Sequence, residues 1–230
     1  MELFGMEKLS LVDYDSNIVA TVFTGNCNFR CPFCHNGPLV NSVSTLKPLP
    51  ESEVLEYVEN RKKMLDGVCI SGGEPTLQKD LPLFCEKIKK LGLKVKLDTN
   101  GTNPETVKLL HRQGLVDYFA VDIKNCLDKY EQIVAIKNFN TIKVEKTVEF
   151  LINECKNYEF RTTIIKEFHT KDDMKKIGEW IQNAEKYFLQ KFKPSDTCLV
   201  SGLTEIDEKT AKEYLEIVSP FVKNAKLRGY

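Results

Sequence analysis

The stretch IVATVFTGNCNFRCPFCHN, residues 18–36, joins a β-branched apolar run to a dense group of cysteines. The run at 18–24 is typical of a buried β-strand. The loop after it carries Cys27, Cys31 and Cys34 with the spacing C-x3-C-x2-C, and His35 follows directly. A strand that leads into three closely spaced thiols predicts a binding site at the end of that strand.

The β-branched run at 18–24 is the first of six along the chain. The others lie at about 67–71, 94–98, 117–123, 159–165 and 186–192. Stretches with helical spacing fall between them, at 51–65, 80–91, 104–113, 145–156 and 171–187. Strand followed by helix, repeated, predicts a parallel sheet with right-handed crossovers.

Six strand–helix units are fewer than the eight of a closed barrel, which usually needs about 250 residues. We therefore expect an α/β fold, a partial (β/α)6 barrel that is open on one side. An open doubly wound sheet is the alternative, and periodicity does not separate the two. In both, the functional site lies at the carboxyl ends of the strands.

Unusual polar strings stand at those strand ends. In chain order they are SGGEPT at 71–76, DTNGT at 98–102, DIK at 122–124, Arg161 within the fifth run and KFKP at 191–194. Loops are polar in general, which could explain any one of these strings. Their shared position at one edge of the predicted sheet favours a common site.

The composition is that of an ordinary folded chain. Of 230 residues, 42% are apolar and 29% are charged, and no low-complexity tract or linker divides them. We expect a single domain over 1–230, with a core at about 18–194 and a C-terminal helical extension at about 205–230. Lys+Arg and Asp+Glu both number 33, and this balance argues against nucleic acid or an anionic membrane as a partner.

The chain carries no sign of export. No apolar run approaches the roughly 20 residues that span a bilayer, and the N-terminal residues 1–17 lack the apolar core of a signal peptide. We expect a cytoplasmic protein whose thiols are reduced. The five cysteines outside the cluster are scattered singly, and we expect them to be small buried hydrophobes. They are Cys69, Cys85, Cys126, Cys155 and Cys198.

Three chemistries fit the cysteine string. CPFCH, residues 31–35, has the form of a c-type haem attachment site, but that reading leaves Cys27 unused. Structural zinc usually takes two separated pairs of ligands, whereas these candidates lie within nine residues. An iron–sulfur cluster takes thiolates, and four are usual for a [4Fe-4S] cube. Three cysteines would leave one iron open to a small molecule.

Six strings carry a resemblance to a known family. In chain order they are VFTGNCNFRCPFCHN, ISGGEPTLQ, LDTNG, YFAVDIK, FRTTI and FLQKF. The cysteine motif, followed by GGEP at the next strand end, resembles the radical S-adenosylmethionine (SAM) superfamily. The whole set resembles the activating proteins of anaerobic ribonucleoside-triphosphate reductases, with pyruvate formate-lyase activating enzymes as the nearest relatives. The resemblance covers about residues 10 to 194.

The resemblance implies a [4Fe-4S] cluster held by Cys27, Cys31 and Cys34, whose open iron chelates SAM. Reductive cleavage of SAM gives a 5′-deoxyadenosyl radical that abstracts a hydrogen atom. Because no further cysteine pair exists, we expect a single cluster.

The resemblance also assigns SAM-binding positions. They are Phe33, His35, Asn36, Gly72, Gly73, Glu74, Asp122, Lys124 and Arg161. The stretch 72–74 matches the part that receives the methionine ammonium group, and Lys124 has the charge to meet the carboxylate. Core packing is the alternative role for Phe33. A structural ion pair is the alternative role for Asp122, Lys124 and Arg161. Lys193 aligns only loosely with another position on the SAM side of the family's site.

Asp98, Thr99 and Asn100 match the family's DTNG string. In pyruvate formate-lyase activators the matching Asp and Thr help to hold a monovalent cation beside the SAM carboxylate. The resemblance therefore makes Asp98 and Thr99 candidate cation ligands.

Before the first strand the chain departs from the family. Relatives carry a Pro-Gly there, whereas this chain reads LVDYDSN at 11–17. Relatives use the Asp that matches Asp13 to meet the glycine loop of a partner enzyme, so we expect Asp13 to bind the substrate protein. A local turn capped by Asp13 is the alternative.

The main hypothesis is an activase that removes hydrogen from a backbone glycine of an anaerobic ribonucleotide reductase large subunit, with flavodoxin or ferredoxin as electron donor. A second hypothesis keeps the radical chemistry but acts on another glycyl-radical enzyme, a peptide or a small molecule. A third is a zinc-binding interaction module without catalysis.

Overall fold

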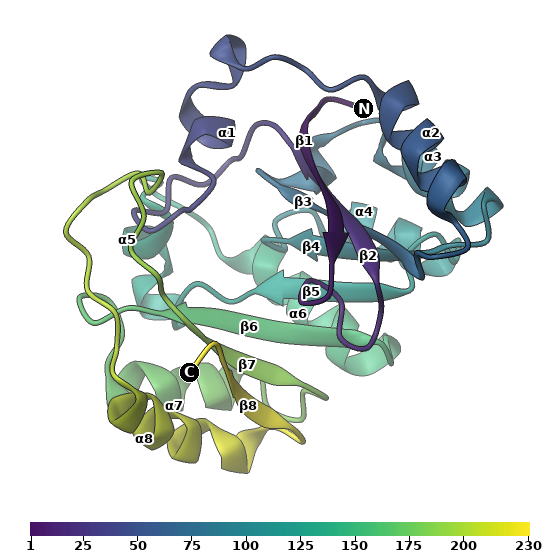
Figure 1. Cartoon of the computed structure of the whole chain (residues 1–230). Coiled ribbons are helices and arrows are strands. Elements are labelled where there is room, and N and C mark those ends of the chain that lie inside the picture. Colours follow the sequence, from purple (N-terminus) through teal and green to yellow (C-terminus); the bar gives the residue numbers. More distant parts are fainter. The chain divides into compact units, whose positions relative to one another are not determined.

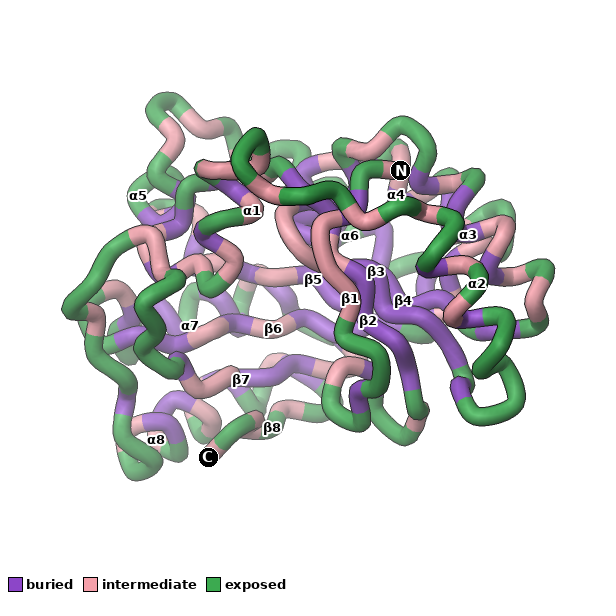
Figure 2. Tube along the Cα trace, turned by 45° about the horizontal axis from the view of Figure 1, so that its top comes forward, coloured by how far each residue is buried: buried purple, intermediate pink, exposed green.

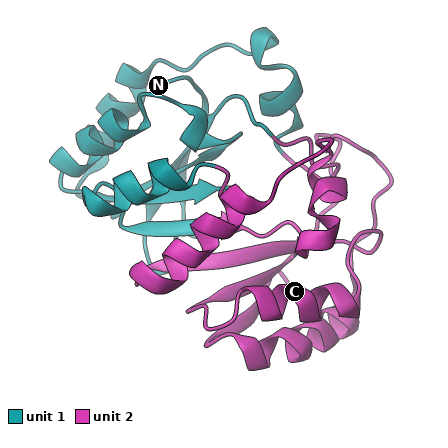
Figure 3. Cartoon of the chain, turned by 180° about the vertical axis from the view of Figure 1, so that it is seen from behind, with its two compact units in different colours: residues 1–28, 36–99, 103–120 teal, residues 29–35, 100–102, 121–230 magenta.

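The computed structural model describes residues 1–230, and the chain divides into two compact units. The first comprises residues 1–28, 36–99 and 103–120, and the second comprises residues 29–35, 100–102 and 121–230 (Figure 3). Strand β5 (Tyr118–Asp122) begins in the first unit and ends in the second.

The first unit is built on four strands that lie in chain order. They are β1 (Leu3–Ser10), β2 (Val19–Thr24), β3 (Gly67–Gly72) and β4 (Lys94–Thr99) (Figure 1). β1 runs antiparallel to β2, whereas β2, β3 and β4 are parallel, with Val22, Ile70 and Leu97 side by side. Most residues of β2, β3 and β4 are buried (Figure 2), which explains their continuous apolar runs.

Helices connect these strands. The first unit contains α1 (Gly37–Asn41), α2 (Glu51–Arg61), α3 (Leu81–Lys90) and α4 (Pro104–Arg112), with 3-10 turns η1 (Val43–Thr45) and η2 (Pro75–Leu77). α2 buries Val54 and Val58, and α3 buries Phe84 and Ile88. Pro104 stands at the first position of α4, where its fixed φ suits a helix start and no amide hydrogen is needed.

The second unit also alternates parallel strands with helices, without an antiparallel edge strand like β1. Its parallel strands are β6 (Tyr158–Ile164), β7 (Tyr187–Lys191) and β8 (Ala225–Arg228). Its helices are α5 (Tyr130–Val134), α6 (Ile142–Glu154), α7 (Lys171–Trp180) and α8 (Glu208–Val218), with 3-10 turns η3 (Leu127–Lys129) and η4 (Ser219–Phe221). Thr170 and Asp173 form a reciprocal capping box that starts α7.

All six predicted strands are present as β2 to β7, and the five predicted helices are α2, α3, α4, α6 and α7. The expected helical C-terminus holds α8 and also β8, which the sequence analysis missed together with β1. Both strands are largely exposed or half-buried, so neither carries the continuous apolar run that marks the inner strands. The single-domain expectation stays a prediction. No helix has both the length and the apolar character that crossing a bilayer would require.

Candidate functional site

The cysteine loop begins directly after β2 with an abrupt change of direction. Asn26 has a φ of 67°, in the left-handed region that Asn tolerates better than most residues. Its amide donates to the carbonyl of Leu39 at 2.9 Å, which ties the loop to α1. Cys27 follows and is half-buried.

Gly72 and Gly73 pack against the start of this loop, backbone on backbone. The amide of Gly73 donates to Thr24 O at 2.8 Å, and the amide of Glu74 donates to Asn26 O at 2.7 Å. A Cβ on Gly73 would lie 2.0 Å from Asn26 O, and Gly72 has a φ of +112°. The sequence analysis assigned these glycines to the stretch that receives the methionine ammonium group, and that role stays a prediction. In the structure they let the end of β3 touch the cysteine loop.

Asn36 is fixed in the same region of the first unit. Its side-chain amide donates to the carbonyl of Gly72 at 2.9 Å. Asn36 therefore connects the residue after the cysteine motif with the GGE string, as the family assignment of both segments to one site requires.

Glu74 is 1% exposed, and its carboxylate sits among hydroxyl groups. Oε1 accepts from the amide of Thr76 at 3.0 Å, from the Thr76 hydroxyl, and from the Thr99 hydroxyl at 2.6 Å. These contacts link the end of β3 to the end of β4 and set the direction of the carboxylate.

Asp98 and Lys96 lie two positions apart on β4. Lys96 Nζ donates to Asp98 Oδ1 at 2.7 Å, and the side chain of Lys96 is 3% exposed. The sequence analysis named Asp98 and did not name Lys96. Two residues apart on a strand share a face, and that spacing was the available signal.

Within the second unit, Cys31 and Cys34 are joined by a turn in which the Cys34 amide donates to Cys31 O at 3.0 Å. Cys31 is buried and Cys34 is half-buried. The Phe33 ring packs on Phe168 at a centroid distance of 6.2 Å. His35 is exposed, stacks on Phe192, and has Nε2 2.7 Å from the carbonyl of Lys193.

Asp122 stands between two cations at the end of β5. Its Oδ2 is 2.9 Å from Lys124 Nζ, and its Oδ1 accepts from Arg161 Nε. Burial by itself would raise the pKa of Asp122, but the charges of Arg161 and Lys124 outweigh it and hold that pKa well below its usual range. Asp122 is therefore ionised throughout the physiological range.

The Lys124 ammonium also faces the cysteine loop. It lies 5.9 Å from the centroid of the Phe33 ring. Burial would lower the pKa of Lys124, yet negative charge on Asp122, Cys31 and Cys34 raises it above its ordinary value. The attraction is mutual, so the ammonium favours negative charge on Cys31 and Cys34.

Two other predicted residues are held by local bonds. Asn100 Oδ1 accepts from the amide and the hydroxyl of Thr102, at 3.0 and 2.7 Å, which closes the turn after β4. Asp13 Oδ2 accepts from the Thr21 hydroxyl at 2.6 Å. Neither contact tests the ligand role that was predicted, so those roles stay predictions.

Comparison with known proteins identifies the family. Residues 21–181 match the sequence model of the radical SAM superfamily. The chain belongs to the radical SAM superfamily. Its α/β fold has an open sheet that does not close on itself, as the sequence analysis expected.

A Methanocaldococcus jannaschii protein with the provisional name glycyl-radical enzyme activating enzyme is 30% identical, over 97% of this chain and 94% of that one. The pyruvate formate-lyase-activating enzyme of Staphylococcus aureus is 27% identical, over 80% of this chain and 78% of that one. Streptococcus suis SuiB bound to SAM superposes with a TM-score of 0.68 at 14% identity, over 90% of this chain. The chain spans 49% of SuiB, and this likeness concerns the fold alone.

Radical SAM membership implies a [4Fe-4S] cluster and SAM, and the cysteine loop fits the cluster. None of the three cysteines of the motif forms a disulfide bond. No three Cys, His, Asp or Glu side chains converge as the ligands of one metal ion would. A cubane does not need such convergence, because each cysteine binds a different iron atom.

His169 is a residue of this site that the sequence analysis missed. It is 2% exposed, its Nδ1 accepts from the amide of Ile165 at 3.1 Å, and its Nε2 lies 3.0 Å from the carbonyl of Lys124. The neutral tautomer with hydrogen on Nε2 satisfies both contacts. Burial lowers the pKa of His169 below its ordinary value, which favours this neutral form. A lone His after the fifth predicted strand gave no spacing signal.

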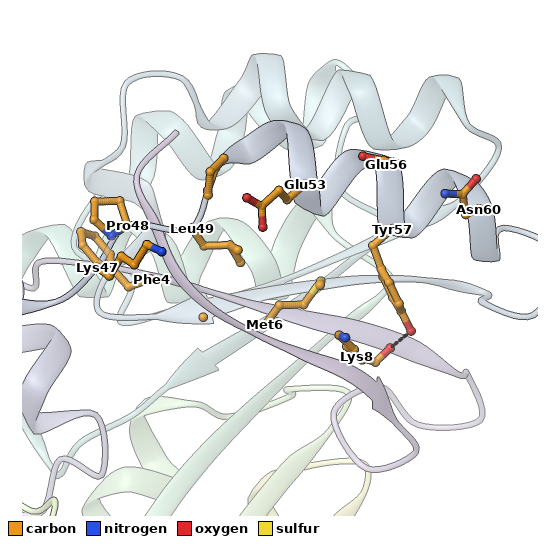
Figure 4. Close-up of a pocket in the computed structure, with 12 residues that line it drawn as sticks. Phe4, Met6, Lys8, Lys47, Pro48, Leu49, Glu53, Glu56, Tyr57 and Asn60 are labelled. Atoms are coloured by element: carbon orange, nitrogen blue, oxygen red, sulfur yellow. Dashed lines mark hydrogen bonds between the residues drawn. The ribbon is translucent and has the colours of Figure 1, made fainter.

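A separate groove of about 600 Å³ lies in the first unit, between β1 and α2 (Figure 4). Phe4, Met6 and Leu49 form its apolar part, and Tyr57 donates to the carbonyl of Lys8 across it. None of the radical SAM motif residues lines this groove. It therefore belongs to the outer edge of β1 and not to the candidate site.

Proposed function

We propose that this radical SAM enzyme is an activase that abstracts hydrogen from a backbone glycine of a glycyl-radical enzyme. The observation that carries the proposal is the 30% identity, over nearly the whole length of both chains, to a protein named for this activity. The pyruvate formate-lyase-activating enzyme adds a second relative with the same class of substrate. The six motif strings identify the residues that we propose to bind the cluster and SAM.

In this proposal Cys27, Cys31 and Cys34 bind the cluster. Together, cluster and SAM supply the radical that removes the hydrogen atom. Negative charge on Cys31 and Cys34 contributes to the raised pKa of Lys124, so we propose that its ammonium steadies their thiolates and meets the SAM carboxylate. Asp122 and Arg161 hold Lys124 in place through the ion pairs at the end of β5.

In this proposal Glu74 would accept the methionine ammonium group of SAM. Its buried carboxylate is oriented by Thr76 and Thr99, and a carboxylate can accept more bonds than these contacts use. We propose that the Phe33 ring and the backbone at His35 would bind near the adenine, that Asn36 completes this CHN string, and that Gly72 and Gly73 belong with Glu74 to the stretch that receives the ammonium group. Asn100 shapes the turn that follows β4.

The proposed target is the large subunit of an anaerobic ribonucleotide reductase, in the cytoplasm, with flavodoxin or ferredoxin as electron donor. The support for this target is the order and the amino-acid sequence of the six family strings. The departure at 11–17, where relatives carry Pro-Gly, makes another glycyl-radical enzyme, a peptide or a small molecule the alternative substrates.

The test combines iron analysis with electron paramagnetic resonance. After anaerobic reconstitution we expect about four irons per chain and no zinc. Reduced protein and SAM, incubated with candidate reductase large subunits, should generate a glycyl radical. SAM cleavage without a glycyl radical on any candidate would shift the substrate to the alternatives. Protein that binds zinc and does not cleave SAM would overturn the proposal.

Cysteine variants provide the matched control. Cys31→Ala should abolish SAM cleavage, whereas Cys85→Ala should retain it. Cys85 lies on α3, and burial raises the pKa of its thiol to about 12, so it does not supply a thiolate. Full SAM cleavage by Cys31→Ala would contradict the assignment of the cluster.

A further inference from the structure

Strand β4 carries two sets of polar side chains at its carboxyl end, one on each face. Side chains alternate along a strand, so Lys96 and Asp98 share one face while Thr99 points to the other. On the first face Lys96 is in register with Cys69 of β3, and Cys69 is in register with Thr21 of β2. Lys96 therefore stands in one cross-strand row with Cys69 and Thr21.

The ammonium of Lys96 is directed to Asp98. Nζ lies 2.7 Å from Oδ1, and the exposed fractions of the two side chains are 3% and 13%. A lysine this deeply buried remains charged only beside an anion, and Asp98 is that anion. The pair is thus a buried ammonium next to a largely buried carboxylate.

Thr99 is committed on the opposite face. Its hydroxyl donates to Glu74 Oε1 at 2.6 Å, which fixes the direction of the hydroxyl hydrogen. The two side chains that the family resemblance offers as ligands for a monovalent cation are therefore both engaged by other groups in the structure. Asp98 already has the Lys96 ammonium beside it, and the Thr99 hydroxyl donates to the Glu74 carboxylate.

The donor set at Asp98 and Thr99 thus does not fit an added monovalent cation. We infer that Lys96 supplies the positive charge at this site, so that the chain binds no K⁺ or Na⁺ at Asp98. The role of this charge toward the SAM carboxylate rests on the proposed function. The ion pair and the independence from K⁺ rest on the geometry of β4 alone.

Thermal unfolding of the reconstituted protein in KCl and in choline chloride, at equal ionic strength, tests the inference without SAM. Wild type should melt at the same temperature in both salts. Lys96→Gln leaves Asp98 without its ammonium, and loss of one partner of a buried pair should lower the melting temperature by about 6 °C or more in choline. K⁺ should restore part of this loss, because the Gln carbonyl and Asp98 now offer oxygen ligands.

Lys89→Gln is the matched control, since Lys89 and Asp117 form a pair of the same length in the first unit but are each 30% exposed. Its melting temperature should change little and should not respond to K⁺. If Lys96→Gln fails to fold, Lys96→Met/Asp98→Asn, which removes both charges, should fold and should ignore K⁺.

SAM affinity gives the second readout. Wild-type affinity should be equal in the two salts, and Lys96→Gln should bind SAM about 10- to 150-fold more weakly in choline. A wild-type affinity or melting temperature that rises specifically with K⁺ would overturn the inference, as would a Lys96→Gln protein that matches wild type in choline. Failure of wild type to bind SAM in either salt would count against the proposed function and leave the melting comparison decisive for Lys96.

Discussion

At the scale of single residues, β4 and β5 each carry near their carboxyl end a carboxylate that pairs with a lysine two positions away. β4 pairs Lys96 with Asp98, and β5 and the residues after it pair Asp122 with Lys124, each across two positions. The spacing places both members on one side of an extended chain, so each carboxylate is neutralised from within its own segment. The sequence analysis named Asp122 and Lys124 because they lie in a family string. It missed Lys96 because none of the six family strings contains this residue.

His169 should make the stability of the protein depend on pH near neutrality. Burial lowers its pKa in the folded state, whereas the unfolded value is about 6.5. A group with a lowered folded pKa contributes stability above the unfolded pKa, and this contribution is lost as the pH falls. Between the two pKa values the free energy of unfolding should fall by up to about 1.4 kcal/mol per pH unit.

The measurement is urea unfolding of reconstituted wild type and His169→Gln from pH 5 to 8. The Gln amide can donate to the Lys124 carbonyl and accept from the Ile165 amide without titrating. The difference between the two proteins should therefore be flat above about pH 7 and should shift in favour of the variant below about pH 6.5. Nearby Asp173 and Lys129 are present in both proteins, so their contributions cancel. Parallel pH profiles would show that His169 does not titrate in this range.

At the scale of elements, the strand ends were easier to predict than the contacts that they make. Inner strands and amphipathic helices are set by burial, which leaves a periodic pattern in the sequence. Edge strands β1 and β8 bury too little to leave such a pattern. The packing of the GGE string on the cysteine loop could not be predicted, because a glycine pattern does not say which backbone comes close.

Gly73→Ala tests that packing. The added Cβ would meet Asn26 O at 2.0 Å, and because the obstacle is backbone, the cysteine loop would have to move. We expect iron content after reconstitution to fall and stability to drop by about 1–3 kcal/mol, the usual cost of overpacking. Gly5→Ala is the control, since its nearest neighbour would be an ordinary contact at 3.6 Å. A Gly73→Ala protein with full iron content and unchanged stability would show that the cysteine loop can move at little energetic cost.

At the scale of the whole molecule, each unit contributes its own part of the family's residue set. The first holds Cys27, Asn36, the GGE string and Asp98, and the second holds Cys31, Cys34 and the charged group at the end of β5. The sequence predicted these assignments because the six strings are contiguous and ordered. It could not supply the substrate, because the six strings do not encode the surface that a protein partner would contact.

The predicted role of Asp13 in binding the partner can be tested separately from SAM cleavage. We expect Asp13→Ala to retain uncoupled SAM cleavage and to lower glycyl-radical formation on the partner at least tenfold, because a carboxylate that positions the glycine loop affects only that step. In the structure Asp13 also accepts from the Thr21 hydroxyl at 2.6 Å, so loss of this bond alone could disturb the turn at 11–17.

Thr21→Val resolves the two roles of Asp13. It removes the same hydrogen bond from the other side and leaves the carboxylate in place. If Asp13 meets the partner, Thr21→Val should form glycyl radical at nearly the wild-type rate while Asp13→Ala does not, and both should unfold at similar urea concentrations. Equal losses of radical formation in the two variants would make the Asp13–Thr21 bond structural. The electron paramagnetic resonance signal of the partner, measured beside methionine release in the same samples, distinguishes these results.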